Sequence, residues 1–340
     1  MIKNKGITAA GNWIIDRTKI IDDYPHQDGL CNIIEEIVSN GGAPYNVLKA
    51  LSKMGFPFSL KGIGSIGSDD LGDIILKDCQ QLKIDTQGII VNTKFNTSYT
   101  DVMTSRKTGR RTFFHYRGAN ALLTKELILK NSLQNKIFHL GYLLLLDNLD
   151  QFSSIETQMT EAAILLRDIR ERGIKTSVDL VSENSDRFID VITPSLPFID
   201  YLFLNEYEAF KLTGIESIVK EKLHVENVKK ATSQLLDMGV NDTVFLHFEN
   251  GAVAASKTNE LYLQPKVKLS DHEIKGTAGA GDAFAAGVLY ALHEDRNNKE
   301  ALRWGVATAA TSLRHPTCSE SIPTLSKILD LYNTQKISSL

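Results

Sequence analysis

The chain alternates between short apolar runs and longer segments in which apolar residues recur every three or four positions. Continuous apolar runs are typical of strands that are buried on both faces, whereas the longer periodicity is typical of helices that cover such a sheet. The strand-like runs are residues 137–146, 174–180, 201–204 and 244–248, and the helical segments between them include residues 156–172 and 225–238. This order predicts an α/β fold with a mostly parallel central sheet and helices on both faces.

Two stretches, residues 14–40 and 95–118, break this alternation because they have the mixed polarity of extended chain. Segments of this kind favour a small, separate β-sheet. No internal repeat or low-complexity linker divides the chain. We therefore expect residues 1–340 to form one domain.

The most informative motif is a glycine-rich turn that leads into an apolar helix over residues 280–293. At such a helix start, the unpaired N–H groups of Gly279, Ala280 and Gly281 and the positive end of the helix dipole can hold an anion. Asp282 falls in the first turn, where a carboxylate suits a general base acting on an incoming hydroxyl group. The alternative for so short a motif is a helix start with a favourable aspartate and glycines kept for packing.

A second glycine-rich helix start lies near the N-terminus. Gly41 and Gly42 precede a predicted helix that ends at Gly55, and Asn46 falls in its first turn. The amide of Asn46 can therefore meet a polar ligand that lies over the glycine backbone. A further glycine-rich stretch, residues 62–72, leads from a strand into the next helix.

Together these stretches resemble the signature regions of the ribokinase-like, phosphofructokinase-B-type carbohydrate kinases. Residues 41–46 and 64–72 resemble the Gly-Gly-x-x-x-Asn helix and the Gly-x-x-Gly-x-Asp-x-x-Gly turn of that family, and residues 276–282 resemble its Asp-Thr-x-Gly-Ala-Gly-Asp turn. Asn205 and Glu208 stand in the matching places of its Asn-x-x-Glu region. The order and spacing fit across nearly the whole chain.

The resemblance implies a three-layer α/β/α sandwich in which the two extended stretches form a β-sheet lid. It implies transfer of the γ-phosphoryl group of ATP to a hydroxyl group of a small sugar or polyol, with Asp282 as general base and the Gly279–Gly281 amides as anion hole. Mg²⁺ would bridge the phosphates mostly through water, with Asn205 and Glu208 in its outer shell, so that no side chain binds the metal directly.

The resemblance also indicates which residues bind the acceptor. The aspartate that matches Asp16 binds sugar hydroxyls in the family, whereas without the resemblance we would interpret Asp16 as a strand-end carboxylate that faces water. Asp147 follows a predicted strand and corresponds either to the acidic sugar contact of ribokinases or to no contact at all. The acceptor candidates are Asn12, Asp16, Gly41, Gly42, Asn46, Arg117 and Asp147.

Arginines in the second extended stretch leave two interpretations open. Arg117 precedes Gly118-Ala-Asn120, which resembles a run in ribokinases, but a Tyr-Arg pair at this place also resembles keto-sugar-acid kinases, where arginine would hold an anionic acceptor. We interpret Arg110 and Arg111 as solvated charge beside a hairpin turn.

Two departures from the family pattern concern the nucleotide side. Gly276 stands where the signature usually begins with aspartate, which puts activation by a monovalent cation such as potassium in doubt. Phe248 replaces the first glycine of the Thr-x-Gly-x-x-Gly strand end, so its ring would reshape the adenine or ribose pocket or stack in it. We assign Phe248, Gly251 and Thr277 to nucleotide binding.

Composition narrows the setting. The 340 residues are 42% hydrophobic, which is enough for a large core, and a net charge of −3 does not favour nucleic acid or an anionic membrane as partner. The chain lacks a signal-peptide core and an apolar run long enough to span a membrane, so we expect it in the cytoplasm. Three dispersed cysteines suit reduced thiols. Exposed strand edges on a lid often pair between subunits, so we expect a homodimer through the lid.

Two other functions stay open at this point. A nucleoside kinase would need an apolar slot beneath the lid, which Trp13 or Tyr45 could line. A sugar- or nucleotide-binding sensor would keep the scaffold without turnover, although the intact turn that ends in Asp282 argues against it.

Overall fold

The apolar runs form a central sheet. The computed structural model describes residues 5–131, 135–154, 158–216, 218–219 and 222–335, and within them nine strands join in the order β15-β14-β13-β10-β9-β8-β1-β4-β5. Neighbouring strands are parallel except where β14 pairs with β13 and β15. These strands are β1 (Ile7–Gly11), β4 (Leu60–Gly67), β5 (Asp85–Asn92), β8 (Ile137–Gly141), β9 (Lys175–Asp179), β10 (Tyr201–Asn205), β13 (Thr243–Phe248), β14 (Gly251–Ser256) and β15 (Leu261–Pro265).

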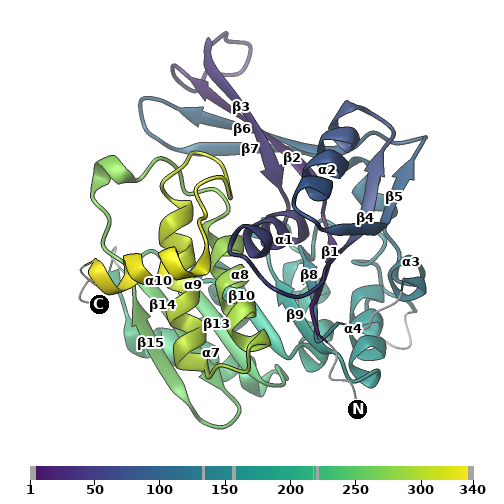
Figure 1. Cartoon of the computed structure of the whole chain (residues 1–340), viewed down its shortest axis with the longest axis vertical. Coiled ribbons are helices and arrows are strands. Elements are labelled where there is room, and N and C mark those ends of the chain that lie inside the picture. Colours follow the sequence, from purple (N-terminus) through teal and green to yellow (C-terminus); the bar gives the residue numbers. More distant parts are fainter. Residues whose placement is uncertain (1–4, 132–134, 155–157, 217, 220–221, 336–340) are drawn as a thin grey trace.

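Helices cover both faces of this sheet (Figure 1). One layer holds α1 (Ala43–Lys53), α2 (Asp70–Gln81), α8 (Ala280–His293), α9 (Asn298–Ser312) and α10 (Leu325–Thr334), and the other holds α3 (Lys125–Lys130), α4 (Glu161–Glu171), α5 (Phe188–Ile192), α6 (Glu206–Thr213) and α7 (Val225–Asp237). Strand β10 shows the cause, because Phe203 packs into the first layer while Leu202 and Leu204 pack into the second. The predicted α/β/α architecture is confirmed.

Short elements complete the described chain: η1 (Gly118–Leu122), η2 (Thr193–Phe198), η3 (Asp271–Glu273), β11 (Ile218–Val219) and β12 (Lys222–Leu223). No helix within the described ranges combines the length and apolar character needed to cross a membrane.

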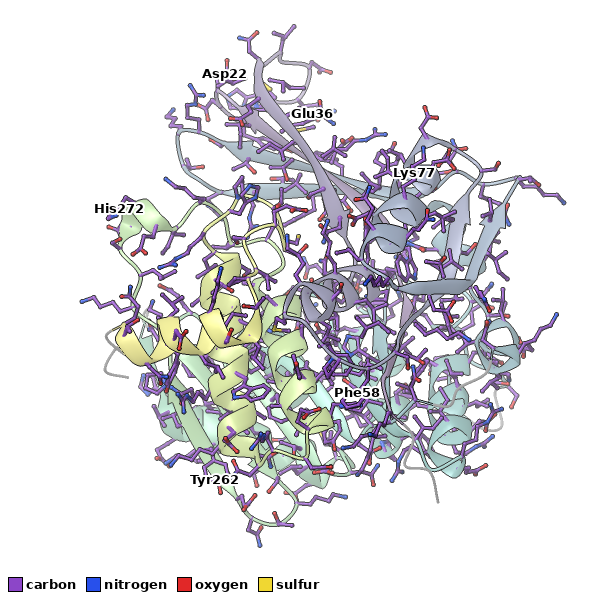
Figure 2. All side chains as sticks on the ribbon, in the orientation of Figure 1. Asp22, Glu36, Phe58, Lys77, Tyr262 and His272 are labelled. Carbon is purple, nitrogen blue, oxygen red and sulfur yellow. The ribbon has the colours of Figure 1, made fainter. Side chains whose placement is uncertain are left out.

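The two extended stretches form a second sheet, here called the lid. Its four strands lie in the order β3-β2-β6-β7, with β2 (Ile14–Ile21), β3 (Ile33–Gly41), β6 (Ser98–Ser105) and β7 (Arg111–Tyr116). The lid projects from the body at the top of Figure 1. Figure 2 shows Asp22 and Glu36 near its outer end, at the opposite end of the molecule from Tyr262 on β15.

Asp16 is not a strand-end carboxylate, which was one of its two interpretations. Strand β1 ends at Gly11, and Asp16 lies within β2 of the lid. Gly11 takes a φ of 131°, and the buried ring of Trp13 stacks on Tyr45 with 5.4 Å between ring centroids. This anchored break lets the chain leave the central sheet and enter the lid. Asp16 is therefore carried by the lid.

The run 137–146 is also shorter as a strand than predicted. Strand β8 ends at Gly141, and the leucines beyond it form a buried turn. The Asp150 carboxylate organises this turn by accepting hydrogen bonds from the backbone N–H groups of Leu144 (2.8 Å) and Leu146 (3.1 Å). The apolar residues after Gly141 therefore indicate burial and not a longer strand.

The helical segment predicted from residue 156 begins later. Residues 155–157 lie outside the described chain, and α4 starts at Glu161, where the Thr160 hydroxyl caps it by accepting a 3.1 Å hydrogen bond from the Ala163 N–H.

Helix α8 is held by close contact with α9. A Cβ at Gly287 would lie 2.6 Å from the Trp304 carbonyl oxygen, and one at Gly305 would lie 2.7 Å from the Phe284 ring. Only glycine at these two places lets the helices approach this closely. The contact fixes the start of α8, and with it the glycine-rich turn.

Candidate active site

A cavity of about 570 Å³ lies between the lid and the carboxyl ends of the central strands. Asp179, Asn205 and His247 line it from the ends of β9, β10 and β13. In an open parallel sheet this edge is the usual place for ligands. The lid contributes Ile14, Asp16, Thr100, Arg111, Phe113 and His115, and the helix starts contribute Gly42, Asn46 and residues 277–282. We call this space the acceptor cavity.

Asp282 lies in the first turn of α8 and is 4% exposed. Its Oδ2 accepts a hydrogen bond from the Asn46 side-chain amide at 2.7 Å, and both of its oxygens lie 2.8 Å from the Tyr142 hydroxyl. Burial raises the pKa of Asp282 to about 6, and the hydrogen bonds from Asn46 and Tyr142 oppose this rise. The carboxyl group is therefore mostly ionised at neutral pH but close enough to titration to exchange a proton.

A buried hydrogen-bond chain orients Asn46. The Asn40 amide donates to Asn46 Oδ1 at 2.5 Å, and the Ser319 hydroxyl donates to Asn40 Oδ1 at 3.1 Å. Because Asn46 Oδ1 is used as an acceptor, its NH₂ group must face Asp282. The network positions the carboxylate before any ligand is present.

The glycine-rich turn has little room for side chains. Gly279 takes a φ of 70°, and a Cβ there would lie 2.4 Å from Cys318 Cβ. A Cβ at Gly281 would lie 3.2 Å from His247 Nε2. The turn can therefore approach a phosphate with its backbone, and residues 277–281 all line the acceptor cavity. The Ala280 N–H makes a long bond of 3.4 Å to the Thr277 carbonyl.

Asp16 lies in the lid strand that borders the same cavity. A Cβ at Gly41 would stand 2.4 Å from Asp16 Oδ1, so Gly41 makes room for this carboxylate instead of lining the cavity itself. Burial, followed by the nearby Asp282 charge, raises the pKa of Asp16 to about 7, while hydrogen bonds from Thr100 and Cys318 lower it. A ligand that donates hydroxyl protons would favour the ionised form.

Arg111 overturns our interpretation of it as solvated hairpin charge. It lines the acceptor cavity, and its Nη2 donates a 2.6 Å hydrogen bond to the Thr277 hydroxyl. Burial lowers the pKa of Arg111, and the Cys318 and Asp16 groups raise it. The lid thus brings one cation to the glycine-rich turn.

His115, also on the lid, meets the cavity beside Thr100, with 3.0 Å between His115 Nδ1 and Thr100 Oγ1.

A second acidic group lines the cavity where β9 and β10 end. The Glu208 carboxylate closes a capping box on α6, in which its Oε2 accepts the Asn205 N–H at 2.9 Å. Burial raises the pKa of Glu208 to about 7. Asp179 is buried beside it, and burial together with the Asp282 and Glu208 charges raises the pKa of Asp179 well above its usual range. A bound cation or phosphate-bound metal would relieve this repulsion.

The described side chains do not themselves form a metal cage. No group of three or more histidine, cysteine, aspartate or glutamate residues in that part of the chain has a metal-binding arrangement. Asn205, Glu208 and Asp179 offer oxygen donors to a hydrated Mg²⁺ held by phosphates, which is the coordination that Mg²⁺ favours.

A second cavity, of about 590 Å³, lies on the other side of the glycine-rich turn, and we call it the nucleotide cavity. Phe248, Gly251 and Thr277, which we assigned to the nucleotide, all line it. Gly251 has a φ of 156°, and a Cβ there would lie 2.2 Å from the Gln264 carbonyl oxygen. Its other apolar walls are Val267, Leu269, Ile274, Phe284, Val306, Ala309, Ala310 and Leu313.

Four residues line both cavities: His247, Thr277, Ala280 and Gly281. The two spaces therefore meet at the glycine-rich turn, next to Asp282. A group passed from one cavity to the other must pass this point.

Besides Gly41, three acceptor candidates do not line the acceptor cavity. Asn12 is fully buried, and its side chain bonds the backbone of the turn after β8, donating to the Leu145 carbonyl at 3.1 Å. Arg117 and Asp147 pair with each other at 2.7 Å. Each side chain has found a partner within the protein, so the geometry does not support assigning these three to acceptor binding.

The proposed nucleoside slot also fails. Trp13 and Tyr45 are 0% and 1% exposed, and the Trp13 Nε1–H donates to the Ile63 carbonyl at 2.9 Å. Both rings belong to the core and leave no face for a base.

Gly276 is closely packed. A Cβ there would lie 2.8 Å from Pro316 Cα and 3.1 Å from the His315 carbonyl oxygen. An aspartate side chain at this place would therefore collide with the loop as it is packed here.

Sequence reasoning missed Asp179, Tyr142 and His247. Asp179 follows an apolar strand, and a polar residue at such a strand end is a signal that could have found it. His247 interrupts the apolar run 244–248, which is a weaker signal. Tyr142 lies inside an apolar run, so nothing in the pattern distinguishes it from core.

Comparisons with known proteins agree with this architecture. Residues 19–325 match a family model described as pfkB family carbohydrate kinase. A ribokinase of Haemophilus influenzae is 26% identical over 298 residues, which cover 86% of this chain and 87% of that protein. An ATP-dependent ribose-1-phosphate kinase of Halopiger xanaduensis is 26% identical over 304 residues, covering 89% and 90%. The structure of Arabidopsis thaliana ribokinase complexed with ribose and ATP aligns with a TM-score of 0.78 at 18% identity, over 97% of this chain and 99% of that one, which is a likeness of fold.

Proposed function

This chain belongs to the pfkB family of carbohydrate kinases, phosphotransferases with an alcohol group as acceptor, and from that premise we propose that it transfers the γ-phosphoryl group of ATP to a hydroxyl group of a small sugar or polyol. One observation carries the proposal. Asp282, held by Asn46 and Tyr142, lies beside the turn that the two cavities share.

In this proposal Asp282 is the general base. An acceptor hydroxyl donates its proton to the Asp282 carboxylate while its oxygen attacks the γ-phosphorus, and the bond from that phosphorus to the bridging oxygen of ADP breaks. A pKa of about 6 keeps Asp282 ionised at neutral pH, as a base requires. The Gly279–Gly281 backbone and Arg111 would stabilise the negative charge on the moving group.

Asp16 is the proposed hydroxyl-binding group on the lid. A carboxylate can accept two hydroxyl protons at once, which suits a polyol. With Asp16 on the lid and Asp282 on the body, an acceptor bound to both would hold the lid closed and exclude water.

The nucleotide would lie in the cavity lined by Phe248 and Gly251, with its phosphates directed at Thr277 and the glycine-rich turn. Mg²⁺ would neutralise phosphate charge when bound, with Asn205 and Glu208 in its outer shell. Because Pro316 takes the space of the usual aspartate side chain at Gly276, we propose that turnover needs no potassium. Equal rates in potassium and choline salts would support this, and a several-fold rise with potassium would overturn it.

We also propose that two copies pair through the lid. Strand β3 is an edge strand, and Ile33 and Val38 on it are 52% and 50% exposed. Pairing of the edges would cover them. Sedimentation at micromolar concentration should give a dimer that Val38→Lys weakens, whereas a wild-type monomer would refute the pairing.

The experiment that tests the function is ADP release with ATP and Mg²⁺ across ketoses, aldoses, sugar acids, polyols and nucleosides, with Asp282→Asn as the blank. Strong Asp282-dependent turnover with a sugar or polyol is the expected result. Turnover with nucleosides alone would change the acceptor class. Silence with every acceptor, while ligands still raise the melting temperature, would favour a sensor.

A further inference from the structure

His247 occupies a place in the site that the proposed mechanism has not used. It lies in β13 beside Asn205 of β10, at the carboxyl end of two parallel strands. Its ring borders both cavities. It also packs against Phe284 of α8, with 5.5 Å between ring centroids.

The edge of the His247 ring faces the glycine-rich turn. A Cβ on Gly281 would lie 3.2 Å from His247 Nε2 and 3.3 Å from its Cε1, so the ring lies directly against the Gly281 backbone. This is the turn that would hold the transferring phosphoryl group. A side chain here is within reach of whatever that backbone binds.

Of the other three residues that line both cavities, Ala280 and Gly281 offer only backbone. The Thr277 hydroxyl accepts the Arg111 hydrogen bond and keeps its own O–H, so His247 is the second side-chain donor at this position. Within the part of the chain that the structure describes, the His247 ring packs against Phe284 but neither of its nitrogens has a hydrogen-bond partner. A polar ring at a cavity junction with an unused N–H is suited to an oxygen-rich ligand.

We infer that His247 is a phosphoryl-binding residue, whose Nε2–H donates a hydrogen bond to an oxygen of the γ-phosphoryl group as it passes between the cavities. The inference rests on the proposed phosphotransfer. It assigns a role to a histidine that is absent from the sequence signatures described above.

The electrostatic surroundings support a neutral donor. Burial lowers the pKa of His247 to about 4, so the free ring carries one N–H and no charge at neutral pH. A neutral donor stabilises phosphate oxygens without forming an ion pair with the nearby carboxylates Asp179 and Asp282.

The alternative is that His247 only fills space between Phe284 and Gly281. Two variants separate these roles. His247→Leu keeps an apolar side chain of similar size and removes the donor, whereas His247→Gln keeps a neutral N–H donor. His272→Leu is the matched control, because His272 is an exposed histidine on η3 (Figure 2) that does not line either cavity.

The first test is binding without an acceptor, using ADP and the non-hydrolysable ATP analogue AMP-PNP as probes in calorimetry. We expect His247→Leu to lower the affinity for AMP-PNP about 10-fold and to change the affinity for ADP less than about 2-fold. The reason is that only AMP-PNP carries the γ-phosphoryl group. His247→Gln should recover most of this loss. An unchanged ratio of the two affinities, or an equal loss for both probes, would overturn the inference.

The second test is turnover. With the acceptor found in the ADP-release panel, kcat of His247→Leu should fall about 10²-fold with little change in acceptor KM, and His247→Gln should lie much closer to wild type. A kcat of His247→Leu equal to or above that of His247→Gln would contradict a donor role. The two tests fail independently: an empty acceptor panel would remove the proposed function but leave the AMP-PNP comparison intact.

Discussion

The two cavities that meet at the glycine-rich turn are of similar size, about 570 and 590 Å³, but they are built differently. Burial raises the pKa values of four carboxyl groups in the acceptor cavity: Asp16, Asp179, Glu208 and Asp282. In the nucleotide cavity only Glu206, among the described lining residues, has a raised pKa.

The two cavities therefore suit different ligands. The acceptor cavity holds carboxyl groups close to titration and takes six of its lining residues from the lid, so it suits proton transfer and selection of hydroxyl groups. The nucleotide cavity draws its walls from Phe248, from the segment around η3 and from α9, so it suits an apolar ring that must be held but not changed. If this division is correct, substitutions on one side should leave the other side's ligand unaffected.

The largest effect is expected from a substitution in the acceptor cavity. Asp16→Ala should lower kcat/KM for the acceptor about 10³-fold, because hydrogen bonds to a buried carboxylate are lost. The KM for ATP should change less than about 2-fold. Steady-state kinetics with each substrate varied in turn checks this. A change only in the KM for ATP would show that Asp16 contributes to nucleotide binding and not to acceptor binding.

The next effect is on the nucleotide side. Ala309 lines the nucleotide cavity from α9, so Ala309→Trp should fill part of that cavity and lower the affinity for ADP about 10²-fold. Acceptor binding, followed by the shift in melting temperature, should persist. Ala309→Ser is the control that keeps the volume small. Equal loss of both ligands would mean that the two cavities are not separate.

The smallest predicted effect concerns the boundary between them. The Tyr142 hydroxyl lowers the pKa of Asp282, so Tyr142→Phe should raise that pKa and move the acidic limb of the kcat/KM profile to higher pH. A base must be ionised, so the variant should lose about 10-fold at pH 6 and recover towards wild type at pH 8. A uniform loss at every pH would indicate a role for Tyr142 in packing instead.

The sequence predicted the fold better than the site. Periodicity and burial are local properties, so the α/β/α architecture, the start of α8 at Ala280 and the two lid segments followed from the pattern. Asp282 and Thr277 of the glycine-rich motif line the acceptor cavity. These positions depend on backbone turns that glycine dictates.

Side-chain partners were harder to predict because they depend on contacts between distant segments. Arg117 and Asp147 neutralise each other across 30 positions in the sequence, and the Asn12 amide bonds the turn after β8. Conversely, Arg111 reaches Thr277 from the lid, 166 positions away. No composition or spacing rule distinguishes an arginine that pairs in this way from one that points to solvent.

The role of Asp282 as general base is best tested by single-turnover phosphoryl transfer by Asp282→Asn at pH 7.5, with ligand binding followed in parallel by calorimetry. If Asp282 is the base at the junction of the two cavities, transfer should fall at least about 10³-fold, while ADP and the acceptor bind with affinities within a few-fold of wild type. Transfer within about 10-fold of wild type would show that Asp282 is not the base.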